Sequence, residues 1–236
     1  MKIPFWKKCL SYITDVHLES HSSEINPALH LLLVKGRLQL CTDNSIYSFE
    51  DQYENFYKVF EKMISASWHY SSVLILGFAM GSIPKMLEDN FKLDLEYTGI
   101  EIDDVIIDLV SDYVLSQLHS PIQLINTDAA IFIDTNQDTY DLICVDLFLD
   151  NVIPNQFQRF DFIKQLKSKL KPNGCVLYNM LGDYQKDKLN AEKYHQSIFS
   201  KVFPNSTLYH TGTNYIMISD RKAIEGMGNG KQGVGN

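Results

Sequence analysis

The sequence predicts an α/β fold: a doubly wound, mainly parallel seven-stranded sheet with an antiparallel C-terminal hairpin, plus a small N-terminal β segment. From residue 72 onward, short apolar runs alternate with helical segments, a pattern typical of a parallel sheet covered on both faces. The last two apolar runs are joined by a short turn, which indicates a hairpin. The 236 residues are 45% hydrophobic and 21% charged, the balance of a globular protein rather than a disordered or fibrous one.

Residues 1–70 are expected to form a small β appendage and a leading helix. Residues 29–49 have the pattern of short strands interrupted by the turn sequences VKGR and TDNS. Residues 53–65 change to a helical period. The apolar residues that share one helical face there are Phe56, Val59, Phe60 and Met63.

Residues 71–222 are expected to form a nucleoside-cofactor-binding α/β domain. The predicted parallel strands are 72–77, 95–102, 122–128, 140–148 and 174–181, and the predicted hairpin strands are 206–212 and 214–220. The predicted helices are 82–89, 104–114, 156–170 and 187–203. Residues 223–236 hold five of the twelve glycines and no apolar period, so a disordered tail is expected there.

Composition excludes several classes of protein. A net charge of −8 disfavours nucleic-acid binding, which needs a basic face. No apolar run reaches the length that spans a bilayer and the N-terminus lacks a signal-peptide core, so a cytoplasmic protein without membrane partners is expected. The histidines and cysteines show no metal-ligand spacing, so no metal is expected. Cys144 and Cys175 lie in apolar runs and are expected to be buried free thiols.

The segment GFAMGS, residues 77–82, joins the first parallel strand to its helix. Gly77, Ala79 and Gly81 give the pattern G-x-A-x-G, which departs from a dinucleotide fingerprint at its third and sixth positions. This spacing suits a nucleoside ligand without a pyrophosphate. The alternative is a tight strand-to-helix connection with no ligand.

Each of the three following strands ends in an acidic residue. Glu101 is placed to accept hydrogen bonds from ribose hydroxyls, with a solvated strand-end carboxylate as the alternative. Asp128 is placed either to accept from an adenine amine or to cap the next turn. Asp146 emerges at the carboxyl edge of the sheet, where open α/β sheets bind ligands. Together with the glycine turn, these acids favour a nucleoside site.

With these residues in view, the chain resembles the spermidine synthase family, within the class I S-adenosylmethionine-dependent methyltransferase fold. The resemblance covers roughly residues 30–222 and rests on the ordered segments VLILGFAMGS, YTGIEID, NTDAA, YDLICVDLFLDNVIP, LKPNGCVLYNML and VFPNSTLYHTGTNYIMIS. It implies S-adenosylmethionine or its decarboxylated form as cofactor. The residues that it assigns to cofactor binding are Gly77, Phe78, Ala79, Gly81, Glu101, Ile102, Asp128 and Ala129. It implies that Asp146 faces the transferred group and carries the catalytic role, and it implies a homodimer.

The resemblance also implies an acceptor site that includes Asp150, Tyr47 and Gln39. Three departures from the family pattern disfavour spermidine synthesis itself. The family's Tyr-His pair in the N-terminal segment becomes Tyr47-Ser48. Met80 replaces an aspartate of the glycine turn, and the acid that follows Asp146 comes at Asp150, one position later than in D-x-x-D. Asp150 therefore has a loop carboxylate as its alternative role.

The expected chemistry is group transfer from a sulfonium to a small, cationic acceptor, an amine being the main candidate. Asp146 is expected to accept the amine's proton, because an amine with a pKa near ~10 is mostly protonated at neutral pH. Asp183 is expected to cap the following helix. The alternatives are a methyltransferase and a non-catalytic adenosyl-nucleoside-binding protein. Met80 bears on the choice of cofactor, since a decarboxylated cofactor needs room or an apolar wall at its missing carboxylate.

Overall fold

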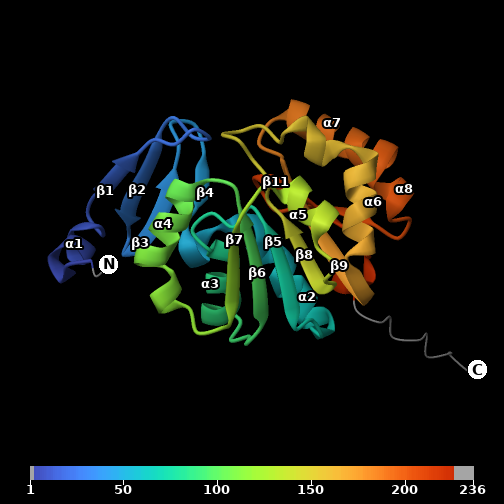
Figure 1. Ribbon diagram of the computed structural model, residues 1–236, viewed down its shortest axis with the longest axis horizontal. Coiled ribbons are helices and arrows are strands. Elements are labelled where there is room, and N and C mark those ends of the chain that lie inside the picture. The colour runs from blue at the N-terminus through green and yellow to red at the C-terminus, as the bar shows by residue number, and fades with distance from the viewer. Residues whose placement is uncertain (1–2, 226–236) are drawn as a thin grey trace, which may run out of the picture.

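The computed structural model describes residues 3–225 and contains two sheets (Figure 1). The first is a four-stranded antiparallel sheet in the order β1-β2-β3-β4. Its strands are β1 (Val16–His21), β2 (Leu29–Val34), β3 (Arg37–Cys41) and β4 (Ile46–Ser48), and a short helix, α1 (Phe5–Leu10), precedes them. The sequence did not predict β1, because in this strand only Val16 is buried and the apolar alternation is therefore weak.

The second sheet has seven strands in the order β10-β11-β9-β8-β5-β6-β7. The strands are β5 (Ser72–Leu76), β6 (Glu96–Glu101), β7 (Ile122–Asn126), β8 (Tyr140–Val145), β9 (Leu170–Leu181), β10 (Thr207–His210) and β11 (Asn214–Ile218). Strands β5 to β9 pair in parallel, whereas β11 pairs antiparallel with both β9 and β10. The predicted mainly parallel sheet with an antiparallel end is confirmed.

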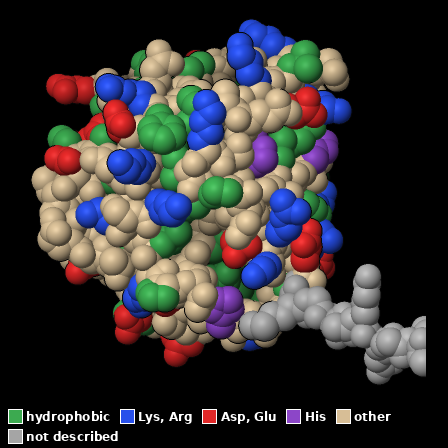
Figure 2. Space-filling view, turned by 90° about the vertical axis from the view of Figure 1, so that its right-hand side faces the viewer, with side chains coloured by type: hydrophobic (Ala, Val, Ile, Leu, Met, Phe, Trp, Pro, Cys, Tyr) green, Lys and Arg blue, Asp and Glu red, His purple; other side chains and the backbone are tan. Residues whose placement is uncertain are grey.

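Helices cover both faces of this sheet. Residues of α2 (Glu54–Ser67), α3 (Ser82–Asp89) and α4 (Asp104–Tyr113) share one buried cluster with it, and residues of α5 (Ala129–Thr135), α6 (Phe160–Ser168), α7 (Gln185–Tyr194) and α8 (Ser200–Val202) share another. Helix α5 was not predicted, and the single helix predicted over 187–203 is divided by a π-helical turn, His195–Phe199. On the face that carries α6, α7 and α8, lysine and arginine side chains are scattered among apolar and acidic ones (Figure 2).

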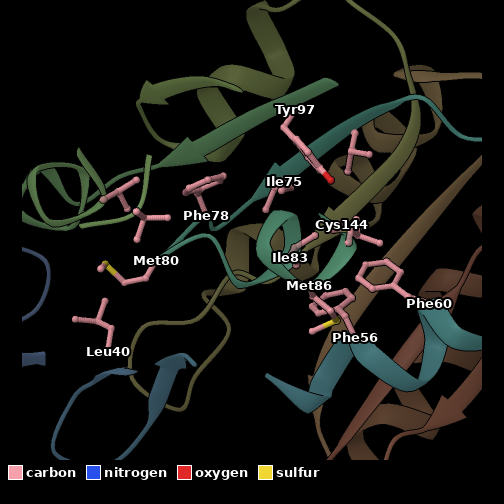
Figure 3. Packing of buried hydrophobic residues seen from close by; sticks show 14 of the residues in the cluster. Leu40, Phe56, Phe60, Ile75, Phe78, Met80, Ile83, Met86, Tyr97 and Cys144 are labelled. Carbon is pink, nitrogen blue, oxygen red and sulfur yellow. The ribbon is translucent and has the colours of Figure 1, made fainter. Parts of the chain in front are cut away.

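The two sheets share one hydrophobic core. Leu40 of β3 belongs to the same buried cluster as Phe56 of α2, Ile75 of β5 and Met80 of the glycine turn (Figure 3). Helix α2 contacts β11 and α9 (Lys222–Glu225), so the leading helix packs on the seven-stranded sheet. The N-terminal β segment is therefore fixed against the main domain by apolar burial, which is the dominant favourable contribution to such packing.

The four cysteines are free thiols, and the C-terminal part of the described chain ends in a short helix. Cys144 and Cys175 are buried free thiols, as predicted, whereas Cys9 is exposed. Residues 223–225 of the predicted disordered tail belong to α9, and residues 226–236 lie outside the described residues. Within residues 3–225, no helix is long and apolar enough to cross a membrane.

Candidate active site

A cavity of about 1020 Å³ opens at the carboxyl edge of the parallel strands. Gly77, Glu101, Asp128 and Asp146, each of which follows or ends one of the strands β5, β6, β7 and β8, all line it. The opposite wall comes from the N-terminal segment, including Asn26 and residues 44–47. The fold thus places the cavity at the sheet edge where ligands of open α/β folds bind, with the small sheet as a second wall.

Backbone crowding explains the glycine at position 77. Gly77 has a φ of +85°, and a Cβ atom there would lie 2.2 Å from the carbonyl oxygen of Asp146. Only glycine combines this left-handed conformation with so close an approach. The turn then directs the amide of Ala79 toward Glu101 Oε2, to which it donates a hydrogen bond of 3.0 Å. Gly77 and Ala79 both line the cavity.

Other residues of the same turn lie beneath it. The Phe78 ring packs on Gly99, where a Cβ atom would lie 2.3 Å from the ring, and Gly81 with a φ of +68° precedes α3. Met80 is buried in the shared core (Figure 3). The described residues that line the cavity do not include Phe78, Met80 or Gly81. Phe78 and Gly81, which the resemblance assigns to cofactor binding, therefore lie outside the cavity wall. Met80 gives a cofactor in the cavity neither extra room nor an apolar wall.

Glu101 is buried at the end of β6. Its Oε2 atom accepts from the Ala79 amide, and its Oε1 atom accepts from the amides of Ile102 and Asp103 at 2.9 and 3.1 Å. Burial raises the pKa of the Glu101 carboxyl, and these hydrogen bonds oppose that rise. A carboxylate has about four acceptor positions, so Glu101 retains capacity for one more donor. Ile102 also lines the cavity.

Asp128 caps helix α5. Its Oδ1 atom accepts from the amides of Ala130 and Ile131 at 2.6 and 3.3 Å, and its Oδ2 atom accepts from the side chain of Gln156 at 3.0 Å. The capping role foreseen as an alternative is therefore present. Ala129 begins the helix, where amides have no partner within the helix, and both Asp128 and Ala129 line the cavity.

Asp146 lies at the centre of a hydrogen-bonded chain. The Tyr53 hydroxyl donates to its Oδ2 atom at 2.9 Å, and the Asn179 side-chain amide donates to its Oδ1 atom at 2.8 Å. Asn214 in turn donates to Asn179 Oδ1 at 2.8 Å, which fixes the orientation of that amide. Burial raises the pKa of Asp146 to about 6, although both hydrogen bonds act in the opposite direction.

Of the three residues predicted for the acceptor site, Asp150 and Tyr47 meet at the cavity and Gln39 does not line it. Asp150 Oδ1 accepts from the Thr42 hydroxyl at 2.6 Å, and Oδ2 accepts from the side-chain amide of Asn44 at 2.9 Å. The Asp150 backbone amide donates to the Tyr47 hydroxyl, so these two residues meet, and both line the cavity. Gln39 lies on β3 and is not among the described lining residues.

The prediction that Asp183 caps the next helix is wrong. Helix α7 starts at Gln185, with Tyr184 in the capping position. The carboxylate of Asp187 accepts from the Tyr184 amide at 3.2 Å, so the chain uses a later acid for this purpose. Asp183 remains exposed and lines the cavity.

Tyr53 is a residue of the site that the sequence analysis did not single out. The aromatic run that includes Tyr47, Phe49 and Tyr53 was a signal, but it does not tell which ring reaches the strand edge. Tyr53 and Asp146 are 93 positions apart, and only the path of the chain around the shared core brings them together. No group of three or more potential metal ligands occurs among the described residues.

Residues 59–219 match the family model described as the spermine/spermidine synthase domain. A probable polyamine aminopropyl transferase of Bifidobacterium longum is 31% identical over 110 residues, which are 47% of this chain and 24% of the relative. The aligned segment thus spans about a quarter of that relative.

Two solved structures share the fold. Spermidine synthase from Thermotoga maritima has a TM-score of 0.65 at 16% identity, over 86% of this chain and 72% of that one. Human methyltransferase-like protein 13, in complex with SAH, has a TM-score of 0.58 at 18% identity, over 70% of this chain and 82% of that one. At these identities the likeness shows the fold alone, whereas the family model covers more than half of the chain. The chain therefore belongs to the spermine/spermidine synthase domain family.

Proposed function

We propose that this protein is a transferase that binds S-adenosylmethionine or its decarboxylated form and transfers an alkyl group to a small amine. The observation that carries the proposal is the position of Asp146. Its carboxylate lies in the cavity between the strand-edge acids and the N-terminal segment, held by Tyr53 and Asn179. Membership of the spermine/spermidine synthase domain family supports the same class of reaction.

The residues present fit an adenosyl nucleoside. Glu101 has one acceptor position left for a ribose hydroxyl, and Ile102 beside it offers an exposed apolar surface. Asp128 and the free first-turn amide of Ala129 offer an acceptor and a donor for the edge of a base. The cavity volume is at the upper end of the range for small-molecule sites, which leaves space for an acceptor beside the nucleoside.

Charge favours cationic ligands in this cavity. Among the described residues that line it, seven are acidic and only Lys186 is a basic Lys or Arg. The acidic residues are Glu54, Glu101, Asp128, Asp146, Asp150, Asp183 and Asp187. A sulfonium and an ammonium group are both attracted by such a field, which raises their local concentration.

When bound, the sulfonium supplies an electrophilic carbon next to a leaving sulfur. A bound amine would take up that carbon as the carbon–sulfur bond breaks, and the sulfur would leave as a neutral thioether. Asp146 takes one proton from the nitrogen and passes it to solvent. A carboxylate with a pKa of about 6 is ionised at neutral pH yet holds a proton more firmly than an ordinary aspartate, which suits this role. Tyr53 and Asn179 keep the carboxylate oriented.

Calorimetric titration with S-adenosylmethionine, its decarboxylated form and methylthioadenosine tests the proposal. Binding of at least one of the three is expected, and the Glu101→Gln variant is expected to bind at least tenfold more weakly. An Asp146→Asn variant should keep most of the nucleoside affinity and lose turnover with amines. A folded protein that binds none of the three nucleosides would contradict the cofactor assignment, and binding without loss of turnover in Asp146→Asn would remove Asp146 from the reaction.

Methyl transfer and aminopropyl transfer remain distinct forms of this proposal. The family model supports aminopropyl transfer, and the fold, which a methyltransferase shares, is compatible with either reaction. Met80 does not separate them, because it is buried in the core. The same titrations decide: tighter binding of the intact cofactor favours methyl transfer, and tighter binding of the decarboxylated form favours aminopropyl transfer.

A further inference from the structure

We propose that Asn26 is a positioning residue of the cavity, which holds the strand-end acid Glu101 and the loop after β8 in place at the same time. The inference rests on the proposed function, because it names a residue that prepares the same site for its nucleoside. It follows from a series of hydrogen bonds that begins at Asp150 and ends at Glu101.

Asn26 lies in the connection between β1 and β2 and is buried. Its Nδ2 atom donates to Asp103 Oδ2 at 2.6 Å, and its Oδ1 atom accepts from the Tyr47 hydroxyl at 2.8 Å. Because a carboxylate accepts hydrogen bonds, the nitrogen end of the amide rather than the oxygen end must face Asp103. The orientation of the Asn26 side chain is therefore fixed by its two partners.

Asp103 connects Asn26 with Glu101. It is fully buried between the N-terminal segment and helix α4, which lies beside the small sheet (Figure 1). Its Oδ2 atom also accepts from the Ser23 hydroxyl at 2.5 Å, and its Oδ1 atom accepts from the Val105 amide at 3.0 Å, which caps α4. The backbone amide of Asp103 donates to Glu101 Oε1 at 3.1 Å. Asn26 thus helps to hold the residue whose amide orients Glu101.

Tyr47 connects Asn26 with the loop after β8. The Asp150 backbone amide donates to the Tyr47 hydroxyl at 2.5 Å, and that hydroxyl donates to Asn26. Asp150 has a φ of +54°, and Leu149 and Val152 exchange two backbone hydrogen bonds around it, so the loop makes a tight turn here. The Tyr47 hydroxyl is therefore the acceptor for an amide at the tip of this turn.

The donors from Asp150 to Asp103 all face the same way. Asp150 donates to Tyr47, and Tyr47 donates to Asn26. Asn26 then donates to Asp103. Hydrogen bonds arranged in such a chain polarise and strengthen one another. Without the Asn26 amide, the buried Asp103 carboxylate loses a donor and the Tyr47 hydroxyl loses its acceptor, which is costly for both groups.

This arrangement matters for ligand binding because Asn26, Tyr47, Asp150 and Glu101 all line the cavity. Glu101 is the buried carboxylate proposed to hold the ribose, and a group that is already oriented loses less freedom when its ligand binds. Nucleoside affinity therefore depends more on Asn26 than on Tyr47, because Asn26 donates directly to the residue whose amide holds Glu101.

Calorimetric titration of methylthioadenosine into the full chain tests the nucleoside side. Asn26→Leu is expected to weaken binding at least about tenfold, and Tyr47→Phe less than about threefold. Asn136→Leu and Tyr140→Phe are the matched controls, because the Asn136 side chain donates to the Tyr140 hydroxyl at 3.1 Å and neither residue lines the cavity. Both controls should bind like wild type. Equal affinities in Asn26→Leu and Asn136→Leu would overturn the inference.

The NMR resonance of the Asp150 amide proton, in protein without ligand, tests the loop side. A short hydrogen bond deshields this proton, so its resonance is expected to move upfield in Tyr47→Phe, which removes the acceptor but keeps the ring. Asn26→Leu should move it in the same direction, and the two controls should not. A residue that only stabilises the fold would leave this resonance in place in the folded variant, so an unmoved resonance in Asn26→Leu would overturn the inference.

A second variant covers the case in which Asn26→Leu does not fold. Asn26→Ser has a single polar atom and cannot replace both ends of the amide, so the same changes are expected from it. The outcomes also separate this inference from the proposed function. If wild type binds methylthioadenosine and Asn26 variants bind it equally well, only the inference fails. If wild type binds none of the three nucleosides, the proposed function fails, and the Asp150 resonance still decides whether Asn26 positions the loop.

Discussion

The Tyr53 hydroxyl donates a hydrogen bond of 2.9 Å to Asp146 Oδ2 and thereby joins the start of helix α2 to the end of strand β8. The two residues belong to the two parts of the chain that the sequence separates at residue 70. Desolvation and the neighbouring Asp146 charge raise the pKa of Tyr53 well above its usual value, so the phenol stays protonated and donates throughout the physiological range. The N-terminal segment therefore takes part in the electrostatics of the cavity.

Tyr53→Phe is expected to raise the pKa of Asp146, because the lost hydrogen bond favours the ionised carboxylate. If Asp146 accepts the amine's proton, the acid limb of the pH–rate profile moves to higher pH in this variant. Steady-state rates between pH 5 and 8 measure the shift. Tyr57→Phe is the control, since Tyr57 lies in the first turn of helix α2, just after Tyr53, and packs on Phe91 outside the cavity. An acid limb at the same pH in Tyr53→Phe and wild type would contradict the role of this hydrogen bond.

Asp146→Asn is expected to change how stability depends on pH. The pKa of Asp146 is about 6 in the folded protein and about 3.9 when unfolded. Because the folded state holds the proton more tightly, wild-type stability falls as the pH rises from 4 to above 6. The variant lacks this loss, so its free energy of unfolding relative to wild type should rise by about 2 kcal/mol between pH 4 and 8. Urea titrations at several pH values measure the difference, and a difference that is constant with pH would refute the shift.

Asp141→Asn is expected to show the opposite pH dependence. Burial disfavours the Asp141 carboxylate, but hydrogen bonds from Ser72, Ser71 and Lys171 outweigh it and hold the pKa well below its usual range. The stabilisation is present above the unfolded pKa of about 3.9 and is lost as the pH falls toward the lower folded value. The variant should therefore lose about 2 kcal/mol at pH 7 and less below pH 3. Equal losses at both pH values would contradict this.

Gly77→Ala is expected to be more destabilising than Gly36→Ala. Both glycines have a φ near +85°, so both substitutions carry the cost of a left-handed alanine, about 1–2 kcal/mol. At Gly36 the added Cβ meets the hydroxyl end of the Tyr12 side chain, which can move, whereas at Gly77 it meets the Asp146 backbone at 2.2 Å. Gly77→Ala should therefore cost at least about 4 kcal/mol or prevent folding. Thermal unfolding compares the two, and similar costs would contradict the backbone clash.

Sequence patterns predicted what depends on local periodicity and strand-end position. The strands that carry Glu101, Asp128 and Asp146 end at one edge because parallel strands share their direction, so these acids were predicted to meet. The direction in which a side chain points after the end of a strand is harder to predict from the sequence. Asp150 points to Thr42 and Asn44 because a left-handed residue turns the loop, and a sequence with an acid at this position is compatible with either orientation.

The glycine turn shows the same limit. Its spacing indicated a close approach, and Gly77 and Ala79 do line the cavity. Phe78 and Gly81 were assigned to the ligand, but Phe78 fills the space above Gly99 and Gly81 precedes the helix. Whether a residue in so short a turn faces the ligand or the core is decided by tertiary packing on Gly99, which lies outside the turn.

The four free thiols differ in exposure, so the order in which a reagent modifies them reports how the molecule opens. Cys9 is open to any reagent, Cys41 is half-buried on the small sheet, and Cys144 and Cys175 are closed inside the adjacent strands β8 and β9. A thiol reagent should therefore modify the chain in stages, first at the terminus, then at the small sheet, and last at the central strands. The delay between the second stage and the third measures how far the small sheet loosens without the large one, and so reports whether the two sheets open together or separately.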